Sequence, residues 1–151
     1  MTYESVPPSH REELIPIFLI GDKDEKDLRR YLDYCDVYLF RDPGVIGCAA
    51  VLRRERSACE LKNISVVPYY QHQGYGTRIM EILFDLYRRA FKVMYADTGD
   101  SPFTIPFYKK LGFFEESRIP NYFVQHYPRP IVEGGVTLCE LVMLKKKLRE
   151  R

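Results

Sequence analysis

The alternation of apolar and polar residues along this chain predicts a series of short β-strands, each bounded by proline, glycine or charged residues. The predicted strands cover residues 3–6, 36–41, 45–54, 59–67, 92–98, 113–117 and 136–144. Asp42-Pro43-Gly44 is a strong turn signal, and an equally short link lies at Arg56-Ser57. The second, third and fourth strands should therefore form an antiparallel meander.

Four segments, residues 9–20, 24–34, 74–90 and 104–111, are predicted to be helical. Ser9 and Glu12 match a capping box at the start of the first helix, in which Pro16 predicts a kink or a late start. Gly112 is expected to end the fourth helix. The third helix has one apolar face, made of Ile79, Ile82, Leu83, Leu86 and Ala90.

The third helix links the fourth and fifth strands, which predicts that these two strands run parallel with a right-handed crossover. The fold class is therefore α/β (α+β), with a mixed, mostly antiparallel sheet. Residues 122–135 are predicted to be an irregular loop, and the basic tail, residues 145–151, to keep the terminus solvated.

Length and composition indicate a single globular domain over residues 1–151. The net charge of +2 gives no reason to expect nucleic acid as a partner, and no apolar run approaches the ~20 residues of a membrane span. Arg53, Arg54 and Arg56 cluster at one turn without interleaved aromatic residues, so we interpret them as a solvated hairpin tip. The spread of the four cysteines and three histidines predicts reduced thiols, a cytoplasmic location and no metal site.

Residues 60–77 combine the end of a strand, a polar loop and the start of a helix. Gly74 and Gly76 leave no Cβ in the way of a ligand, and the helix start adds unpaired N–H groups and the positive end of its dipole. This pattern predicts a phosphate-bearing ligand; the alternative is a plain strand-to-helix turn. The residues predicted to hold the ligand are Gln71, His72, Gln73, Gly74, Tyr75, Gly76 and Thr77. The loop lacks the lysine of a P-loop and the third glycine of a dinucleotide-binding turn.

Gln71, Gly74 and Gly76 occupy the three defining positions of the pattern Gln/Arg-x-x-Gly-x-Gly/Ala. The loop thus resembles the signature with which GCN5-related N-acetyltransferases (GNAT) grip the pyrophosphate of acetyl-CoA. A second run, from Phe107 to Phe113, is similar to the family's Phe-Tyr-x-x-x-Gly-Phe signature. The resemblance implies a GNAT-like fold: six to seven strands, about four helices and a parallel pair at strands 4 and 5.

Residues 98–101 and 126–131 resemble a bacterial subgroup of this family whose substrate is poorly defined. In that subgroup the position of Asp100 is usually asparagine, and a carboxylate cannot donate the hydrogen bond that an amide would.

The family resemblance also implies roles for four residues. The backbone of Val66 and Val67 would hold the pantetheine arm of acetyl-CoA, Tyr108 would protonate the departing thiolate, and Glu60 would act as the base. Two alternatives stay open, because Tyr108 could simply pack between a helix and the sheet, and Glu60 could be an exposed strand residue.

The resulting hypothesis is an N-acetyltransferase that moves an acetyl group from acetyl-CoA to a primary amine of a small molecule or peptide by direct attack in a ternary complex. One alternative is a catalytically inactive acyl-CoA-binding regulatory module, and another is an enzyme that binds ATP in the same loop. Glu60, Asp100 and Glu133 would suit a cationic amine if they line one cleft, with His126 and Glu133 as lesser candidates for contacting it. A homodimer is expected from the frequency of paired subunits.

Overall fold

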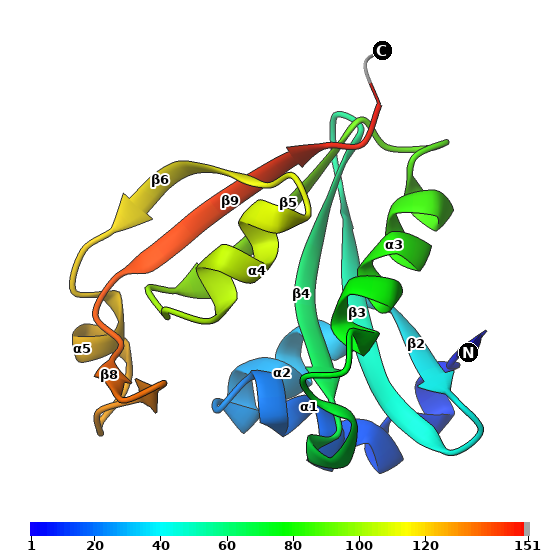
Figure 1. The fold of residues 1–151 in the computed structure, drawn as a ribbon, viewed down its shortest axis with the longest axis horizontal. Helices are drawn as coiled ribbons and strands as arrows, with labels where there is room; N and C mark the ends of the chain where they lie inside the picture. Colours follow the sequence, from blue (N-terminus) through cyan, green and yellow to red (C-terminus); the bar gives the residue numbers. More distant parts are fainter. Residues whose placement is uncertain (150–151) are drawn as a thin grey trace.

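A seven-stranded sheet forms the centre of the structure, a computed structural model that describes residues 1–149 (Figure 1). The strand order is β1-β2-β3-β4-β5-β9-β6. The strands are β1 (Thr2–Ser5), β2 (Cys35–Arg41), β3 (Val45–Arg54), β4 (Ala58–Val66), β5 (Val93–Gly99), β6 (Phe114–Ile119) and β9 (Leu141–Lys147). Only β4 and β5 pair in parallel, and all other neighbours are antiparallel. The predicted mixed sheet with one parallel pair is confirmed.

Short turns produce the predicted meander of β2, β3 and β4. In the first turn the N–H of Asp42 donates to the carbonyl of Gly44 (2.7 Å). In the second turn, Arg56 and Ser57 both adopt positive φ angles, 61° and 59°. Two such residues in succession match the right-handed twist of the flanking strands, as in the tight turns of hairpins.

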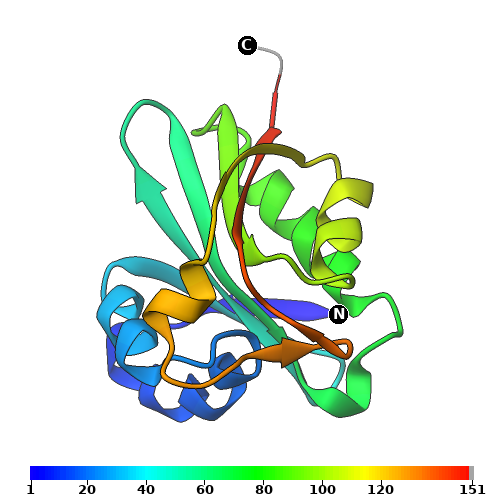
Figure 2. The same ribbon diagram turned by 90° about the vertical axis from the view of Figure 1, so that its left-hand side faces the viewer.

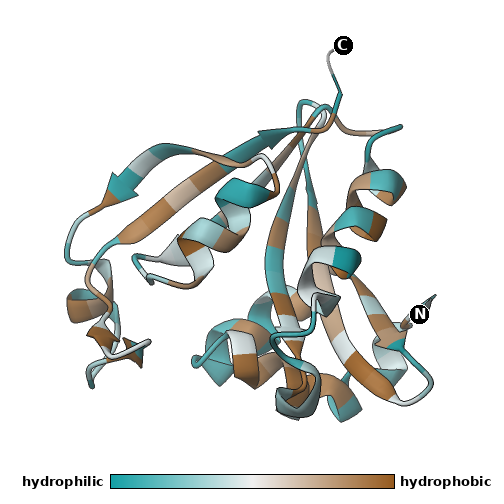
Figure 3. Ribbon diagram, viewed as in Figure 1, coloured by the Kyte–Doolittle hydropathy of each residue, from teal (hydrophilic) through white to brown (hydrophobic). Residues whose placement is uncertain are grey.

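Helices cover both faces of the sheet (Figures 1 and 2). They are α1 (Ile15–Gly21), α2 (Glu25–Leu32), α3 (Tyr75–Tyr87), α4 (Thr104–Lys110) and α5 (Tyr122–His126), with 3-10 turns at Pro8–His10, Glu12–Leu14 and Pro68–Tyr70. One apolar core lies between the sheet and α3 and α4, and a second lies between the sheet and α1 and α2. Figure 3 accordingly shows both hydrophobic and hydrophilic segments along α3. Within residues 1–149 no helix is long and apolar enough to cross a membrane.

The first predicted helix begins later than its capping box suggested. Ser9 lies in a 3-10 turn without capping, and no side chain caps α1, which starts at Ile15. Pro16 occupies the first turn of α1, where its missing N–H would have no partner in any case. The capping box was therefore wrong, and the late start expected from Pro16 is confirmed.

The buried face of α3 is also rotated from the predicted one. Leu86 is 38% exposed and Ala90 lies beyond the end of the helix, so neither belongs to the core. The buried residues are Ile79, Met80, Leu83, Phe84 and Tyr87. The larger side chains of Met80, Phe84 and Tyr87 occupy the core because their burial removes more apolar area from water.

The C-terminal region departs most from the predictions. Residues 122–135 are not wholly irregular, because they contain α5 and the first strand of a small hairpin, β7 (Val132–Glu133) with β8 (Val136–Thr137). The predicted strand at residues 136–144 is in fact β8 followed, after a break, by β9. The prediction that residues 145–151 form a solvated tail was wrong for its first part, because β9 continues to Lys147 and Leu148 is only 9% exposed. Residues 150 and 151 lie outside the described part.

Close approach between β3 and β4 requires a glycine at position 47. A Cβ placed on Gly47 would lie 2.1 Å from the carbonyl oxygen of Ser65 on β4. We expect Gly47→Ala to lower the free energy of unfolding, measured with urea, by about 3 kcal/mol or more, because the backbone of β4 must shift. Gly44→Ala is the matched control, since its Cβ would meet nothing closer than the Tyr70 hydroxyl at 3.8 Å. Equal stability of the two variants would contradict this prediction.

Candidate functional site

The parallel strands β4 and β5 separate halfway along their length. They pair only over Ala58–Leu61 and Val93–Ala96, and the last residues of β5 pair with β9 alone. A bulge in β4 accompanies the separation, because Ala50 and Val51 of β3 oppose Asn63 and Leu61, which leaves Lys62 as an extra residue. A bulge bends its strand and increases the local twist. The edge of β4 that would face β5 is therefore free beyond Leu61 (Figure 1).

The free edge of β4 presents backbone groups of Val66. The N–H of Val67 donates to Ile46 on β3 (2.8 Å), so the groups of Val66 point to the opposite edge, as antiparallel pairing requires. The carbonyl of Val66 already accepts a hydrogen bond from Nε2 of Gln71 (2.9 Å). Both backbone groups of Val67 are engaged, since its carbonyl accepts from Tyr70. Of the two residues expected to hold an extended ligand, only Val66 offers a donor toward the gap.

The loop before α3 forms a concave array of N–H groups. His72 and Gly74 have φ angles of 62° and 84°, whereas Gln73 between them does not lie in the left-handed region. Such alternation makes successive N–H groups converge, as in anion-binding nests. Within residues 1–149, no N–H from His72 to Thr77 donates a loop hydrogen bond, and the first turn of α3 cannot satisfy its own donors. The donor set therefore fits a phosphate.

The two glycines of this loop have different roles. Nothing lies within 4 Å of a Cβ placed on Gly74, so its positive φ angle is what requires glycine there. A Cβ on Gly76 would lie 3.3 Å from the ring of Phe107, so Gly76 allows α3 to approach α4. Sequence reasoning had given both glycines the same two roles, room for the ligand and unusual φ/ψ angles, with relief of crowding as the alternative.

The long side chains of the loop are directed back to the protein. Gln73 donates to the carbonyl of Tyr69 (2.9 Å), and the Tyr75 hydroxyl donates to Asp42 (2.9 Å). Gln71 is fixed on Val66 as described above. The loop thus offers backbone rather than side-chain donors to a ligand.

Tyr108 lies on α4, with its ring against Phe107 and Phe113 (centroid distances 5.1 and 5.3 Å). Only 8% of the residue is exposed, and burial raises the pKa of its phenol above the ordinary 10.0. Within residues 1–149 its hydroxyl makes no hydrogen bond, and the oxygen is not among the fully buried polar atoms. Tyr108 is therefore both a packed aromatic residue and a protonated donor without an internal acceptor.

Glu60 lies on the opposite face of the sheet from the α3 core. Its neighbours Cys59 and Leu61 are in that core, whereas the Glu60 side chain is 13% exposed and contacts Lys62 (3.2 Å) and Arg54 (3.7 Å). Glu60 is thus a largely buried, paired carboxylate rather than the exposed strand residue of the alternative reading.

A second carboxylate, Asp97, was missed by sequence reasoning. Asp97 lies on β5 just beyond the point where β4 and β5 separate. Partial burial, and then the negative charge of Glu60, raise the pKa of Asp97, while Lys62 opposes the shift. Alternation along the predicted strand at residues 92–98 places Asp97 on the same face as Tyr95 and would have revealed it. We call the sheet surface that carries Glu60, Lys62, Tyr95 and Asp97 the polar face.

A buried hydrogen-bond network fixes the corner between α1 and α2 to the polar face. Nδ2 of Asn63 donates to the Phe18 carbonyl (3.0 Å), and the Ser65 hydroxyl donates to Oδ1 of Asn63 (2.7 Å). The Tyr31 hydroxyl donates to Asp22 (2.9 Å) and is 3.1 Å from Nδ2 of Asn63. Lys62 lies over the Tyr31 ring at 5.2 Å.

Acidic groups dominate the electrostatics around this corner. Burial and then the charge of Asp27 raise the pKa of Tyr122 in α5, Lys62 opposes the shift, and Asp22 and Asp97 add to it. Burial raises the pKa of Tyr127 too, with Asp22 as the next cause. The carboxylates of the α1–α2 corner therefore contribute to the raised pKa of both tyrosines.

Three further candidates have local roles. Asp100 accepts a hydrogen bond from the N–H of Cys139 (2.8 Å), which ties the end of β5 to the segment before β9. His126 stacks on Tyr122 with ring centroids 4.2 Å apart. Glu133 belongs to the β7–β8 hairpin. Over residues 1–149, no group of three or more histidine, cysteine or acidic side chains is arranged to hold a metal ion.

Comparisons with known proteins agree with this geometry. Residues 33–115, more than half of the chain, match the family model described as acetyltransferase (GNAT) domain. The chain is 24% identical over 139 residues to the uncharacterized N-acetyltransferase YvbK of Bacillus subtilis (strain 168), with 88% of each protein covered.

Two solved structures share the fold over almost the whole chain. A GNAT family acetyltransferase from Elizabethkingia anophelis with acetyl-CoA bound has a TM-score of 0.86 at 24% identity, covering 97% of each chain. A Bacillus subtilis acetyltransferase in complex with CoA has a TM-score of 0.87 at 22% identity, covering 96% of this chain and 97% of the other.

Proposed function

The chain belongs to the GNAT acetyltransferase family, and from this premise we propose that it is a single acetyltransferase domain, residues 1–151, that transfers an acetyl group from acetyl-CoA to a primary amine. The observation that carries the proposal is the separation of β4 and β5 beside a loop of unpaired N–H groups. An extended cosubstrate with a pyrophosphate needs both features: a strand edge for its arm and a nest for its phosphates.

The residues fit acetyl-CoA as follows. The N–H groups of residues 72–77 would hold the pyrophosphate, and the N–H of Val66 would hold an amide of the pantetheine arm. Bound acetyl-CoA supplies an acetyl group activated as a thioester. Holding the thioester beside the amine on rigid strands removes much of the entropic barrier to their reaction.

Proton transfer is assigned to groups on both sides of the gap. Glu60 takes a proton from the attacking amine, and Lys62 and Arg54 keep its carboxylate in place. Tyr108 gives its proton to the departing thiolate, which its raised pKa allows because the phenol stays protonated at neutral pH. The amine nitrogen forms the new bond to the acetyl carbon, and the carbon–sulfur bond breaks.

Two carboxylates on the polar face, Glu60 on β4 and Asp97 on β5, would favour a cationic amine at the gap. Of the three carboxylates expected from the sequence, Glu60 belongs to this pair. Asp100 instead accepts a hydrogen bond from the N–H of Cys139, and Glu133 lies in the β7–β8 hairpin.

Calorimetric titration with acetyl-CoA, with ATP and NAD as controls, tests the ligand of the loop. We expect selective binding of acetyl-CoA that weakens at least about tenfold in Gly74→Val, because a β-branched residue resists the positive φ angle. Gly135→Val is the matched control: Gly135 also has a positive φ angle (75°) and no atom within 4 Å of its Cβ position. Failure of the folded wild-type protein to bind acetyl-CoA would refute the proposed function.

Turnover should depend on the Tyr108 hydroxyl. We expect Tyr108→Phe to lower kcat about 100-fold while the Kd for acetyl-CoA stays the same, because the ring still packs and only the proton donor is lost. Since the pKa of Tyr108 lies above 10.0, the wild-type rate should not fall through its ionisation below that pH. Tyr34→Phe, at a tyrosine that is 77% exposed, is the control. Unchanged turnover in Tyr108→Phe would remove Tyr108 from the mechanism.

The two carboxylates can be separated by their pH profiles. If Glu60 is the base, Glu60→Gln should abolish the acidic limb of kcat/KM against pH and lower the plateau about 100-fold or more. Asp97→Asn should leave that limb in place, because in the proposed mechanism Asp97 takes no proton from the amine. The reverse outcome, with the limb lost in Asp97→Asn, would assign the base to Asp97.

A further inference from the structure

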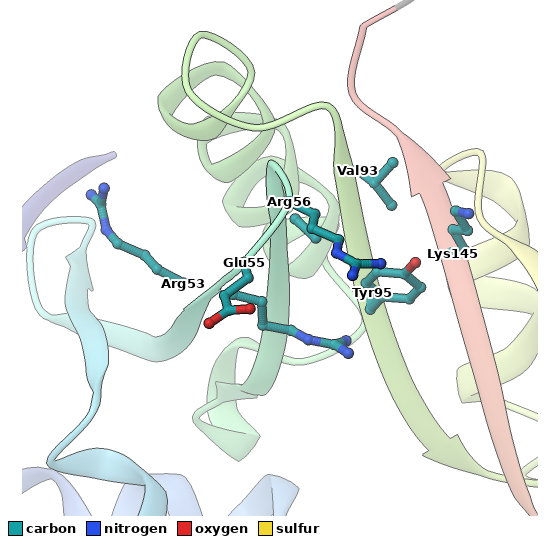
Figure 4. Close-up of a pocket in the computed structure, with 8 residues that line it drawn as sticks. Arg53, Glu55, Arg56, Val93, Tyr95 and Lys145 are labelled. Atoms are coloured by element: carbon teal, nitrogen blue, oxygen red, sulfur yellow. The ribbon is translucent and has the colours of Figure 1, made fainter.

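A basic cavity of about 730 Å³ lies on the polar face, between the tip of the β3–β4 hairpin and strands β5 and β9 (Figure 4). Its lining includes Arg54 and Arg56 from the hairpin, Tyr95 from β5 and Lys145 from β9. The arginines that looked like a solvated hairpin tip in the sequence are thus joined in space by an aromatic residue and a lysine.

Two cations lie at the ring of Tyr95. The Arg54 guanidinium lies 4.7 Å from the centroid of the Tyr95 ring, and the Lys145 ammonium lies 5.6 Å from it. Arg56 lines the same cavity, whereas Arg53 and Glu55 point away from Tyr95 in Figure 4. Arg53 instead pairs with Asp36 (2.8 Å), so it adds no charge to the cavity.

These cations are incompletely neutralised. Arg54 is 3.7 Å from Glu60, which is closer to Lys62, and Lys145 is 3.8 Å from Glu116. Arg56 has no ion-pair partner within the described residues. Like charges that converge repel one another, and an anion placed between them removes that repulsion. Guanidinium groups match the paired oxygens of a carboxylate or phosphate, and the Tyr95 hydroxyl is a further donor.

The cavity lies next to the proposed active site. Arg54 contacts Glu60, and Tyr95 is two residues before Asp97 on the same side of β5. Two residues of a strand span about 7 Å. On the polar face Glu60 therefore lies in register with Tyr95, between Arg54 and Lys62, and the second carboxylate, Asp97, lies further along β5 where β4 and β5 separate.

On the premise of the proposed function, we infer that the acceptor is an amine that also carries a carboxylate or phosphate about 7 Å from its nitrogen. The amine lies at Asp97, with Glu60 on the neighbouring strand as its base, and the anionic group lies among Arg54, Arg56, Lys145 and Tyr95. ω-Amino acids, dipeptides and phosphorylated amines have this chemistry.

A transfer assay that follows thiol release tests the inference. The acceptors are ω-amino acids of increasing length, each compared with the alkylamine of the same length. We expect kcat/KM to favour the amino acids at least about tenfold at the matching length, and this ratio to fall toward one in Arg56→Gln. Lys110→Gln, which removes one positive charge from the exposed surface of α4, should keep the ratio. Equal rates for amino acids and alkylamines would overturn the inference.

A binding measurement separates failure of the cavity from failure of the proposed function. Inorganic phosphate is titrated into Gly74→Val, in which the loop before α3 is impaired, and into the double variant that also carries Arg56→Gln. We expect phosphate to bind the first protein and at least about tenfold more weakly to the second. If no amine is acetylated but this difference is found, the cavity is an anion site and the proposed function fails. If the two proteins bind phosphate equally, the inference fails whatever the transfer assay shows.

Discussion

One extra residue in β4, Lys62, determines how the proposed site is built. Before the bulge, Cys59 and Leu61 face the core under α3; after it, Ile64 and Val66 face that same core, while Lys62 and Asn63 both point to the opposite side. Without the bulge, alternation along β4 would send Ile64 and Val66 to the polar side. The bulge thus keeps the core intact while it bends β4 away from β5. The same irregularity frees the N–H of Val66 and places a lysine beside Glu60.

Separated strands need a substitute for the hydrogen bonds that a continuous ladder would provide. The network of Asn63, Ser65 and Tyr31 supplies it by fastening α1 and α2 to β4 directly after the bulge. All buried side-chain polar atoms of residues 1–149 have partners, so the network is complete. A satisfied buried network is rigid, because any displacement leaves a polar group without a partner in a medium of low dielectric. The gap is therefore held open by the folded protein itself, and the backbone donors need no reorganisation to meet a ligand.

Sequence reasoning found the features that depend on local chemistry. The meander, the parallel pair and the loop with Gly74 follow from turn residues, alternation and motif spacing, and all three are present. Sequence reasoning failed for the features that depend on packing between residues distant in the sequence. No local signal marks the extra residue at Lys62, the rotation of α3 toward Phe84 and Tyr87, or the break between β8 and β9. The position of Asp97 on the polar face could have been predicted from the alternation of residues along its strand. The cavity around Tyr95 was not, because Arg54, Tyr95 and Lys145 come from three strands that are distant in sequence.

Charges of opposite sign lie side by side on the polar face: cations in the cavity around Tyr95, and carboxylates near the point where β4 and β5 separate. Arg54 contacts both Tyr95 and Glu60, so it joins the positive cavity to the carboxylates at the gap. A ligand with a single charge of either sign would be attracted to one end and repelled from the other, and the opposing forces would leave its orientation poorly defined. A molecule with both charges at the right spacing gains attraction at each end and is aligned along β5 as it binds. Because attack on a thioester depends on the direction from which the amine approaches, this alignment contributes to the rate as well as to selectivity. This arrangement of charges would therefore select acceptors by the distance between their positive and negative groups rather than by their net charge.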